Sequence, residues 1–350
     1  MEFTRKSLSS GYQKTMIKII DKRNRPIKDL RISVMDTCNY RCPYCMPADK
    51  FDDEYQFLRK DQRLGFLEIE KVVKVFAELG VNKVRLTGGE PLLRRNLDRL
   101  IKFIKRIDGI NDIALTTNGQ LLKKQLPKLI EAGLDRVNIS LDTIDEDLYY
   151  KMSGNKGRLN VVLDAIDAAS QSSLKSVKLN CVVQKGVNDD QIIPLLERYQ
   201  NTNVVVRFIE FMDVGNKNDW HKNNVVNFKD ILKMIQNHWK IQPANANYIG
   251  EVASRYRYDN HKGEIGFITS ISKPFCQDCS RARISADGKL YTCLFASEAF
   301  DLRPHLRHEN DDFLSQYIQN IWQNRDDRYS EIRHELKGKK DKIEMYVIGG

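Results

Sequence analysis

The sequence predicts an α/β protein built on a mostly parallel sheet. Short segments rich in Val, Ile and Leu alternate about six times with amphipathic helical patterns, and this alternation is typical of parallel strands joined by helical crossovers. Polar motifs follow the predicted strands, at the end where parallel sheets bind their ligands. An array of this length is shorter than a full barrel, so the pattern fits either a partial barrel or an open doubly wound sheet.

The predicted strands are short apolar runs of the length that buried strands have. They are Leu30–Met35, Lys83–Thr87, Asp112–Thr117, Arg136–Leu141, Val177–Val183 and Val204–Ile209. The predicted helices carry apolar residues at three- and four-residue spacing. They are Leu67–Leu79, Leu92–Ile107, Leu121–Ala132, Leu159–Ala169 and Gln191–Tyr199. Gly80 and Gly133 can each end a helix just before the next strand.

Beyond these units the pattern changes, and the chain is expected to leave the array through Glu210–Gly215. A helix is predicted over Phe228–Trp239 and a strand over Glu264–Ile271. We therefore expect an N-terminal tail over residues 1–28, a core over residues 29–215 and a C-terminal region over residues 216–350. The basic, Ser-rich residues 1–16 faintly resemble an organelle transit peptide, but a disordered tail is the favoured interpretation.

The composition favours anionic partners only weakly. The chain has 57 Lys and Arg against 47 Asp and Glu, a net charge of +10, which suits nucleic acid, nucleoside triphosphates or acidic lipid but is mostly solvated surface. No apolar run approaches the roughly 18 residues of a membrane span. We expect a cytoplasmic protein that binds neither membrane nor nucleic acid.

The 7 cysteines fall into two groups of three plus Cys181, a pattern that indicates metal binding in a reducing compartment rather than a disulfide framework. Cys38, Cys42 and Cys45 form a C-x3-C-x2-C pattern in TCNYRCPYCMP. Thiolates are soft ligands for iron, zinc or copper, and three of them leave a fourth position open. A disulfide and a structural zinc site are the alternatives. The three-residue gap is unusual for structural zinc, so the spacing favours an iron–sulfur cluster.

The second group is Cys276, Cys279 and Cys293, in a C-x2-C-x13-C pattern. A zinc ribbon completed by His305 or by a distant residue is the alternative to a second cluster. Arg281 and Arg283, in the intervening SRAR stretch, have guanidiniums suited to an anionic or carbonyl-rich ligand. Cys181, on a predicted strand, is interpreted as a small core residue, and His305 and His308 as surface residues.

A third motif, Gly88-Gly89-Glu90-Pro91, follows the second predicted strand. It matches neither a P-loop nor a dinucleotide-binding GxGxxG pattern. From local sequence alone, it fits a tight strand-to-helix turn as well as a binding site.

The first cysteine motif, with Tyr44 before its last cysteine, resembles the signature of the radical S-adenosylmethionine (SAM) superfamily. The resemblance implies a partial (β/α)6 barrel, and a [4Fe-4S] cluster whose open iron chelates the amine and carboxylate of SAM. It also implies that the glycines of GGEP lie beside the SAM methionyl amine. Five features together are similar to the MoaA family, the GTP 3′,8-cyclases of molybdenum cofactor biosynthesis. They are TCNYRCPYCMP, RLTGGEPLLR, LTTNG, the second cysteine group with SRAR, and a terminal Gly-Gly.

This resemblance implies a lyase in which a deoxyadenosyl radical removes hydrogen from C3′ of GTP, and the sugar radical then attacks C8 of guanine. It implies a second [4Fe-4S] cluster that holds the purine ring, and no catalytic side chain beyond the cluster ligands. The implied partners are a second copy of the chain in a homodimer, an electron donor and a downstream cyclic pyranopterin monophosphate synthase. The implied SAM contacts are Tyr44, Gly89, Ser140 and Met212. The implied GTP contacts are Arg31, Arg85, Thr116, Lys178, Arg281, Ala282 and Arg283, with Arg207, Gly349 and Gly350 as weaker candidates.

Arg31, Arg85, Lys178 and Arg207 all lie on predicted strands. Charges within an apolar sheet are costly unless paired. They can face the barrel lumen and be offset by a triphosphate, or they can form structural ion pairs with Asp or Glu across the sheet.

Two rival functions come from other classes. One is a non-catalytic zinc protein that binds nucleic acid, which predicts colourless protein containing zinc. The other is a different radical SAM enzyme with an auxiliary cluster, such as a peptide modifier, which predicts no reaction with GTP.

Overall fold

The computed structural model describes residues 19–248, 250–308, 310–335 and 342–349. Its strands form one sheet in the order β12-β11-β10-β1-β2-β3-β4-β5-β6-β9-β8-β7. The first six are β1 (Asp29–Ser33), β2 (Lys83–Thr87), β3 (Asp112–Thr117), β4 (Arg136–Ser140), β5 (Ser176–Val183) and β6 (Val204–Glu210). The prediction for residues 1–16 lies outside the described residues.

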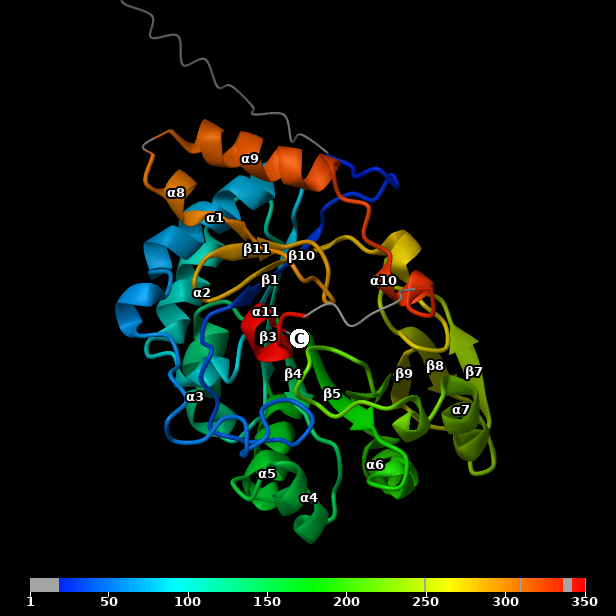
Figure 1. Ribbon diagram of the computed structural model, residues 1–350. Coiled ribbons are helices and arrows are strands. Elements are labelled where there is room, and N and C mark those ends of the chain that lie inside the picture. Colours follow the sequence, from blue (N-terminus) through cyan, green and yellow to red (C-terminus); the bar gives the residue numbers. More distant parts are fainter. Residues whose placement is uncertain (1–18, 249, 309, 336–341, 350) are drawn as a thin grey trace, which may run out of the picture.

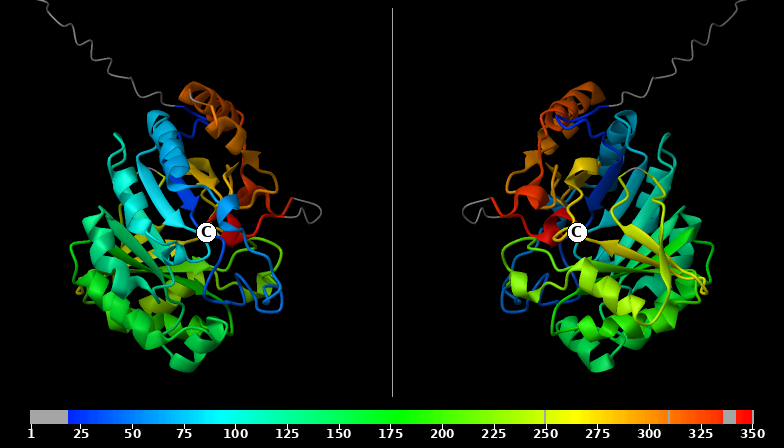
Figure 2. Two further views of the ribbon diagram at one scale, coloured as in Figure 1. Left: turned by 90° about the vertical axis from the view of Figure 1, so that its left-hand side faces the viewer. Right: turned by 90° about the vertical axis from the view of Figure 1, so that its right-hand side faces the viewer.

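The order of β1 to β6 decides between the two predicted architectures. All six strands are parallel, and each pairs with the next strand in the chain. A doubly wound sheet reverses its strand order at a switch point, and these strands show no such reversal. The curved sheet is covered on its outside by helices (Figures 1 and 2), which confirms the predicted partial barrel.

The helices that join these strands are α1 (Phe66–Glu78), α2 (Leu97–Lys105), α3 (Leu122–Glu131), α4 (Glu146–Met152), α5 (Leu159–Ser170) and α6 (Ile192–Tyr199). The predicted helix Leu92–Ile107 was wrong in its first third. Pro91–Leu93 forms a short 3-10 turn, η2, and Asn96 then adopts a left-handed backbone with φ 59° before α2 begins. A left-handed residue cannot continue an α-helix, so the helix starts five residues later than predicted.

The C-terminal region extends both edges of this sheet. β9 (Glu264–Ile268) is parallel to β6, and its outer neighbours are β8 (Ser254–Tyr258) and β7 (Ile241–Ala244). At the other edge β10 (Arg281–Ile284) is parallel to β1. It is followed outward by the antiparallel strands β11 (Lys289–Tyr291) and β12 (Phe300–Asp301). The sheet therefore continues without a break into the second half of the chain.

The remaining helices are α7 (Phe228–Gln236), α8 (Arg303–Leu306), α9 (Asp311–Gln323), α10 (Tyr329–Ile332) and α11 (Met345–Ile348). The short segments η1 (Lys60–Gln62), η3 (Asp189–Gln191), η4 (Lys222–Asn224) and η5 (Cys276–Asp278) are 3-10 turns. α9 packs against α1 on the outside of the sheet, where Lys71 and Lys74 form ion pairs with Asp311. α11 lies at the centre of the molecule (Figures 1 and 2). None of the described helices is long and apolar enough to cross a bilayer.

Alternation along the strands divides the sheet into an apolar outer face and a polar lumen. On β1, Leu30 and Ile32 are buried in the main hydrophobic core, so the intervening Arg31 points to the opposite face. Register places Arg31 beside Arg85 of β2 and Arg283 of β10. Three arginines on neighbouring strands therefore face the lumen at one level.

Candidate active site

The first cysteine group lies at the carboxyl end of β1. Cys38, Cys42 and Cys45 are free thiols, and all three line a cavity of about 190 Å³. Of the positions assigned to SAM from the resemblance, Tyr44, Gly89 and Ser140 line the same cavity. Met212 is half-buried on the loop after β6 and is not part of the described lining. The fold thus gathers one cysteine group and three of four predicted SAM positions around one space.

The two glycines of GGEP are required by the approach of two backbone segments. Gly89 donates its N–H to the carbonyl of Met35 at 2.7 Å, and Glu90 donates to that of Thr37 at 2.9 Å. A Cβ at Gly88 would overlap the Met35 carbonyl, and one at Gly89 would overlap the Thr37 carbonyl. GGEP is therefore a tight turn that supports the start of the cysteine loop, and it also lines the cavity.

Glu90 joins this turn to the LTTNG turn after β3. Its buried carboxylate accepts hydrogen bonds from Leu92 N at 2.9 Å, Thr117 Oγ1 at 2.8 Å and Asn118 N at 2.8 Å. Burial raises the pKa of Glu90 to about 7, although these hydrogen bonds favour its ionised form. The side chain amide of Asn118 contacts Cys38 Sγ at 3.9 Å.

On the opposite wall, the Tyr44 hydroxyl donates to Asp142 Oδ2 at 2.7 Å. The other carboxylate oxygen accepts from Val182 N at 2.8 Å, and burial raises the pKa of Asp142 to about 6. Asp142 follows β4 and also lines the cavity. It therefore fixes the orientation of the tyrosine ring beside the cysteine loop.

The three thiols of the first group are buried in a way that disfavours free thiolates. Burial, and then the charge of Glu90, raise the pKa of Cys38 to about 12. Burial and the neighbouring cysteines raise the pKa of both Cys42 and Cys45. A metal centre would bind all three as thiolates and remove this cost. Three thiols on one loop that line the same cavity fit the ligand set of a cluster with one open position.

Five cations face the lumen without a direct ion pair, although the charges of Asp29 and Glu251 attract them from a greater distance. Within the described residues, no ion pair involves Arg31, Arg85, Lys178, Arg207 or Arg283, whereas the nearby Arg136 pairs with Asp112. Burial and the neighbouring arginines lower the pKa of Arg207 to about 9 and of Arg283 to about 10. The same two causes lower the pKa of Arg31 well below its ordinary value. The structural ion pairs that we considered as an alternative are thus not what holds these side chains.

The positions assigned to GTP differ in what their side chains contact. Thr116 lines the first cavity. Arg207 donates from Nη2 to Asn138 Oδ1 at 2.7 Å. Ala282 is fully buried in the hydrophobic core on the outer face of β10, so its side chain points away from the lumen. Arg283 donates to the carbonyl of Gly349.

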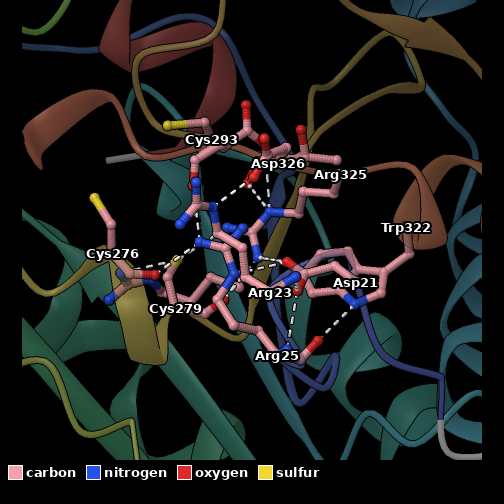
Figure 3. Close-up of polar contacts among 12 residues, drawn as sticks. Asp21, Arg23, Arg25, Cys276, Cys279, Cys293, Trp322, Arg325 and Asp326 are labelled. Atoms are coloured by element: carbon pink, nitrogen blue, oxygen red, sulfur yellow. Dashed lines mark hydrogen bonds and ion pairs between the residues drawn. The ribbon is translucent and has the colours of Figure 1, made fainter. Parts of the chain in front are cut away.

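The second cysteine group lies at the other end of the lumen. Cys279 precedes β10, which runs parallel to β1, whereas Cys38 follows β1. Cys276, Cys279 and Cys293 are free thiols and lie together beside Arg25 and Arg325 (Figure 3). The three in-register arginines of β10, β1 and β2 therefore lie between the two cysteine groups.

Cys279 differs from the other cysteines in its charge environment. Its Sγ accepts from Arg281 Nη2 at 3.1 Å and from Arg325 Nη2 at 3.3 Å. Burial alone would raise the pKa of Cys279, but the two guanidiniums outweigh it and lower the value to about 6. Arg25 Nη2, next to this group, is buried without a hydrogen-bond partner among the described residues. An anionic metal centre bound by thiolates fits this surplus of donors.

As the side chains stand, no group of three or more His, Cys, Asp or Glu in the described part of the chain could hold a metal ion. A four-iron cube binds its thiolates at separate corners, so its ligands are further apart than those of one ion.

His305 stacks on Tyr317, with 4.0 Å between ring centroids. Cys181 is fully buried in the core, as expected.

The C-terminal segment lies against the first cavity. Met345 and Tyr346 of α11 line the first cavity, and Tyr346 exchanges a hydrogen bond with Tyr55 at 2.6 Å between hydroxyls. Gly349 has φ 66°, and a Cβ there would overlap the side chain of Thr87 at the end of β2. Gly350 lies outside the described residues. The chain end is thus packed between the first cavity and Arg283.

Sequence reasoning missed several residues of this site. Glu90 was considered only as part of the GGEP turn, and Asp142, Met345 and Tyr346 were not singled out as site residues. Asp21, Arg25 and Arg325, beside the second cysteine group, had no signal at all. Their contacts depend on segments that are far apart in the chain, as Asp21 and Arg325 are separated by 304 positions.

Comparisons with known proteins agree with this geometry. A model of the radical SAM superfamily matches residues 32–199, and a model of the Molybdenum Cofactor Synthesis C family matches residues 204–331. The chain is 49% identical over 330 residues to GTP 3′,8-cyclase of Xanthomonas campestris pv. campestris strain 8004, covering 94% of this chain and 97% of that protein. It is 49% identical over 337 residues to GTP 3′,8-cyclase of Staphylococcus haemolyticus strain JCSC1435, covering 95% and 99%.

Among solved structures, Streptococcus suis SuiB bound to S-adenosylmethionine has a TM-score of 0.60 at 16% identity, over 85% of this chain and 69% of that chain. This similarity shows the fold alone. The radical SAM model and the near full-length relatives show that the chain belongs to the radical SAM superfamily and, within it, to the GTP 3′,8-cyclase family.

Proposed function

We propose that the protein is a GTP 3′,8-cyclase, a radical SAM lyase. It converts GTP to (8S)-3′,8-cyclo-7,8-dihydroguanosine 5′-triphosphate in the first step of molybdenum cofactor biosynthesis. The observation that carries the proposal is the set of five lumen cations that form no direct ion pair within the described residues, of which Arg31, Arg85 and Arg283 lie in register between the two cysteine groups. Buried cations without partners are costly, and a nucleoside triphosphate offers the several negative charges that would offset them.

In this proposal Cys38, Cys42 and Cys45 hold one [4Fe-4S] cluster, and Cys276, Cys279 and Cys293 hold a second. Tyr44, Gly89, Ser140 and Met212 bind SAM. When bound, the first cluster and SAM supply one-electron cleavage of a carbon–sulfur bond and hence a carbon radical that can take a hydrogen atom. Residues 29–215 carry the first cluster and SAM, and residues 216–350 carry the second cluster.

The lumen side chains bind and orient the substrate. Arg31, Arg85 and Lys178 contact the phosphates, with Arg207 beside them. Arg281 and Arg283, with the backbone at Ala282, hold the end of GTP that faces the second cysteine group. Thr116 lines the first cavity, which supports it as the point where GTP approaches SAM. α11, with Gly349 and Gly350 behind it, covers the first cavity and limits side reactions of a radical formed there.

The partners follow from the same assignment. An electron donor reduces the first cluster, and a cyclic pyranopterin monophosphate synthase rearranges the cyclised nucleotide. The protein works in the cytoplasm as a homodimer.

The test is anaerobic incubation of the cluster-loaded protein with SAM, a reductant and GTP. We expect 5′-deoxyadenosine and a cyclised nucleotide. Cys42→Ala should abolish SAM cleavage, whereas Arg283→Ala should weaken GTP binding and leave some uncoupled SAM cleavage. Loss of SAM cleavage in both variants to the same degree would contradict this division, and so would zinc in place of iron and acid-labile sulfide in the wild type.

A further inference from the structure

A buried charge cluster, which we call the Asp21 triad, lies next to the second cysteine group. It consists of Asp21, Arg25 and Arg325, whose side chains are 0%, 2% and 1% exposed. Asp21 Oδ2 accepts from Arg25 Nε at 2.6 Å and from Arg325 Nη1 at 3.1 Å. One buried carboxylate thus faces two guanidiniums, and a second, half-buried carboxylate, that of Asp327, pairs with Arg325 Nε at 3.3 Å. Burying these charges is costly unless each of them is paired or used by another group.

The two arginines also donate to the main chain at or beside the cysteines of the second group (Figure 3). Arg25 Nη1 donates to the carbonyl of Cys276 at 2.7 Å. Arg325 Nη1 donates to the carbonyl of Cys279 at 2.7 Å, and its Nε donates to that of Thr292 at 3.1 Å. Thr292 directly precedes Cys293. Each of the three cysteines therefore has an arginine hydrogen bond either to its own carbonyl or to the carbonyl of the residue before it.

The triad also lies where the segment before β1, the end of α9 and the second cysteine group meet. Asp21 and Arg25 lie in the segment before β1, and Arg325 follows α9. Trp322 of α9 donates its indole N–H to the carbonyl of Arg25 at 3.1 Å, and Arg25 Nη1 also reaches the carbonyl of Asp327 at 2.7 Å. These hydrogen bonds join the segment before β1 to the chain that follows α9, and they join both to the second cysteine group.

We propose that the Asp21 triad positions the second cysteine group and stabilises the negative charge of the metal centre bound there. This inference rests on the proposed function only in needing a second cluster. Arg325 Nη2 already contacts Cys279 Sγ at 3.3 Å, and Arg25 Nη2 is buried without a partner among the described residues. Both nitrogens can donate to sulfur of the centre, and hydrogen bonds to cluster sulfurs tune its reduction potential.

The three residues of the Asp21 triad are positioning residues, because the cations proposed to contact the substrate are other side chains in the lumen. The conservative change Arg→Lys separates charge from geometry. Lysine keeps the positive charge, but it cannot hold Asp21 and two carbonyls at once with a planar fork. Arg25→Lys and Arg325→Lys are therefore the primary variants, and Asp21→Asn removes the shared carboxylate.

Two control variants match them. Arg255→Lys weakens another ion pair, with Glu264, in which the arginine is 10% exposed and donates its hydrogen bonds to Glu264 and to the carbonyl of Asn245 rather than to a cysteine. Arg41→Lys changes an arginine that holds the carbonyl of Cys38 at 2.9 Å in the first cysteine group. The variant with Cys276, Cys279 and Cys293 all replaced by Ser gives the signal of the first cluster alone.

The experiment measures iron and sulfide content, the electron paramagnetic resonance spectrum of the reduced protein, and the midpoint potential of each cluster, all on full-length protein reconstituted anaerobically. We expect the triad variants to lose up to half the iron, or to shift the spectrum and lower the potential of the second cluster. SAM cleavage at the first cluster should persist. Arg255→Lys should change neither cluster, and Arg41→Lys should affect the first alone.

Two results would overturn the proposal. One is a set of triad variants with wild-type iron, spectrum and potentials. The other is loss of both clusters together, which would show that the triad supports the whole fold. If the wild type holds two clusters but forms no cyclised nucleotide, the proposed function fails and the triad proposal stands. If it holds no second cluster, the triad proposal also fails.

Discussion

Lys178 shows how the lumen changes the chemistry of a single residue. Burial, followed by the charges of Arg207 and Arg136, lowers the pKa of Lys178 to about 8. Register places Lys178 of β5 beside Asn138 of β4, so its charge meets no carboxylate on that neighbour. A bound polyanion would favour the protonated amine and raise this pKa again.

GTP affinity should therefore depend on pH. Above about pH 8 the free protein loses the Lys178 proton, so binding must take up a proton, and the affinity falls by up to about tenfold per pH unit. Isothermal titration of GTP between pH 7.5 and 9 would measure this fall. Lys178→Arg should bind GTP with a flatter pH profile, because guanidinium stays charged to higher pH. An equally steep fall in that variant would remove Lys178 from the site.

The chain end offers a second test at residue scale. Gly349 combines φ 66° with close approach to Thr87, so Gly349→Ala should displace the segment that covers the first cavity. We expect a loss of cyclised nucleotide of at least tenfold and a small change in melting temperature. Deleting Gly349 and Gly350 should have the same effect. A large drop in melting temperature would show a role in folding instead.

At this scale, residues within motifs could be predicted and residues between motifs could not. Tyr44, Gly89 and Thr116 lie within motifs, Ser140 was assigned from the family resemblance alone, and the structure gathers all four at one cavity. Glu90 acts through hydrogen bonds to a turn 28 positions away, a partnership that only the fold reveals. The Asp21 triad depends on packing of α9 against the start of the chain, which has no local signature.

At the scale of elements, the turn after β2 and the loop after β1 form one unit. The close backbone approach at Gly89 fixes where the cysteine loop begins. The cavity therefore depends on two neighbouring strand ends rather than on the cysteines alone.

Gly89→Ala should disturb this unit. The added Cβ meets main-chain oxygens that cannot rotate away, so we expect a loss of about 1–3 kcal/mol in the free energy of unfolding and less iron in the first cluster. Gly65→Ala is the matched control, since its Cβ would make only an ordinary contact at 3.4 Å. Chemical denaturation and iron analysis of both variants would test this. Equal losses of stability and of iron in the two variants would contradict the role given to the backbone contact at Gly89.

α9 is an element that its sequence could have predicted. Its buried residues Leu314, Ile318, Ile321 and Trp322 have helical spacing, but no helix was assigned there. β10 could not be predicted in the same way. It is four residues long with two arginines, and it is a strand because it pairs with β1.

Leu314→Ala should lower the free energy of unfolding by about 2–5 kcal/mol, because Leu314 is 0% exposed against the core. Phe313→Ala, next to it, should change stability by less than about 0.5 kcal/mol, because Phe313 is 55% exposed. Denaturant unfolding of the two variants would measure the difference. Similar losses would show that α9 is not packed as described.

At the scale of the whole molecule, the sheet places two cysteine groups at opposite ends of one cationic lumen. The β1–β10 pairing accounts for this arrangement, because one group follows β1 and the other precedes β10. The strand alternation that buries Leu30 and Ile32 outside the barrel also turns Arg31 inward. Fold and charge distribution thus have the same origin in the strand pattern.

The most direct test of this account follows one hydrogen atom. The cluster-loaded protein is incubated with SAM, a reductant and GTP deuterated at C3′, and the 5′-deoxyadenosine is analysed by mass spectrometry. If the lumen holds GTP between the two cysteine groups with its ribose toward the first cavity, deuterium should appear in the 5′-deoxyadenosine and the nucleotide product should lack it. Unlabelled 5′-deoxyadenosine, formed at the same rate with or without GTP, would contradict the account.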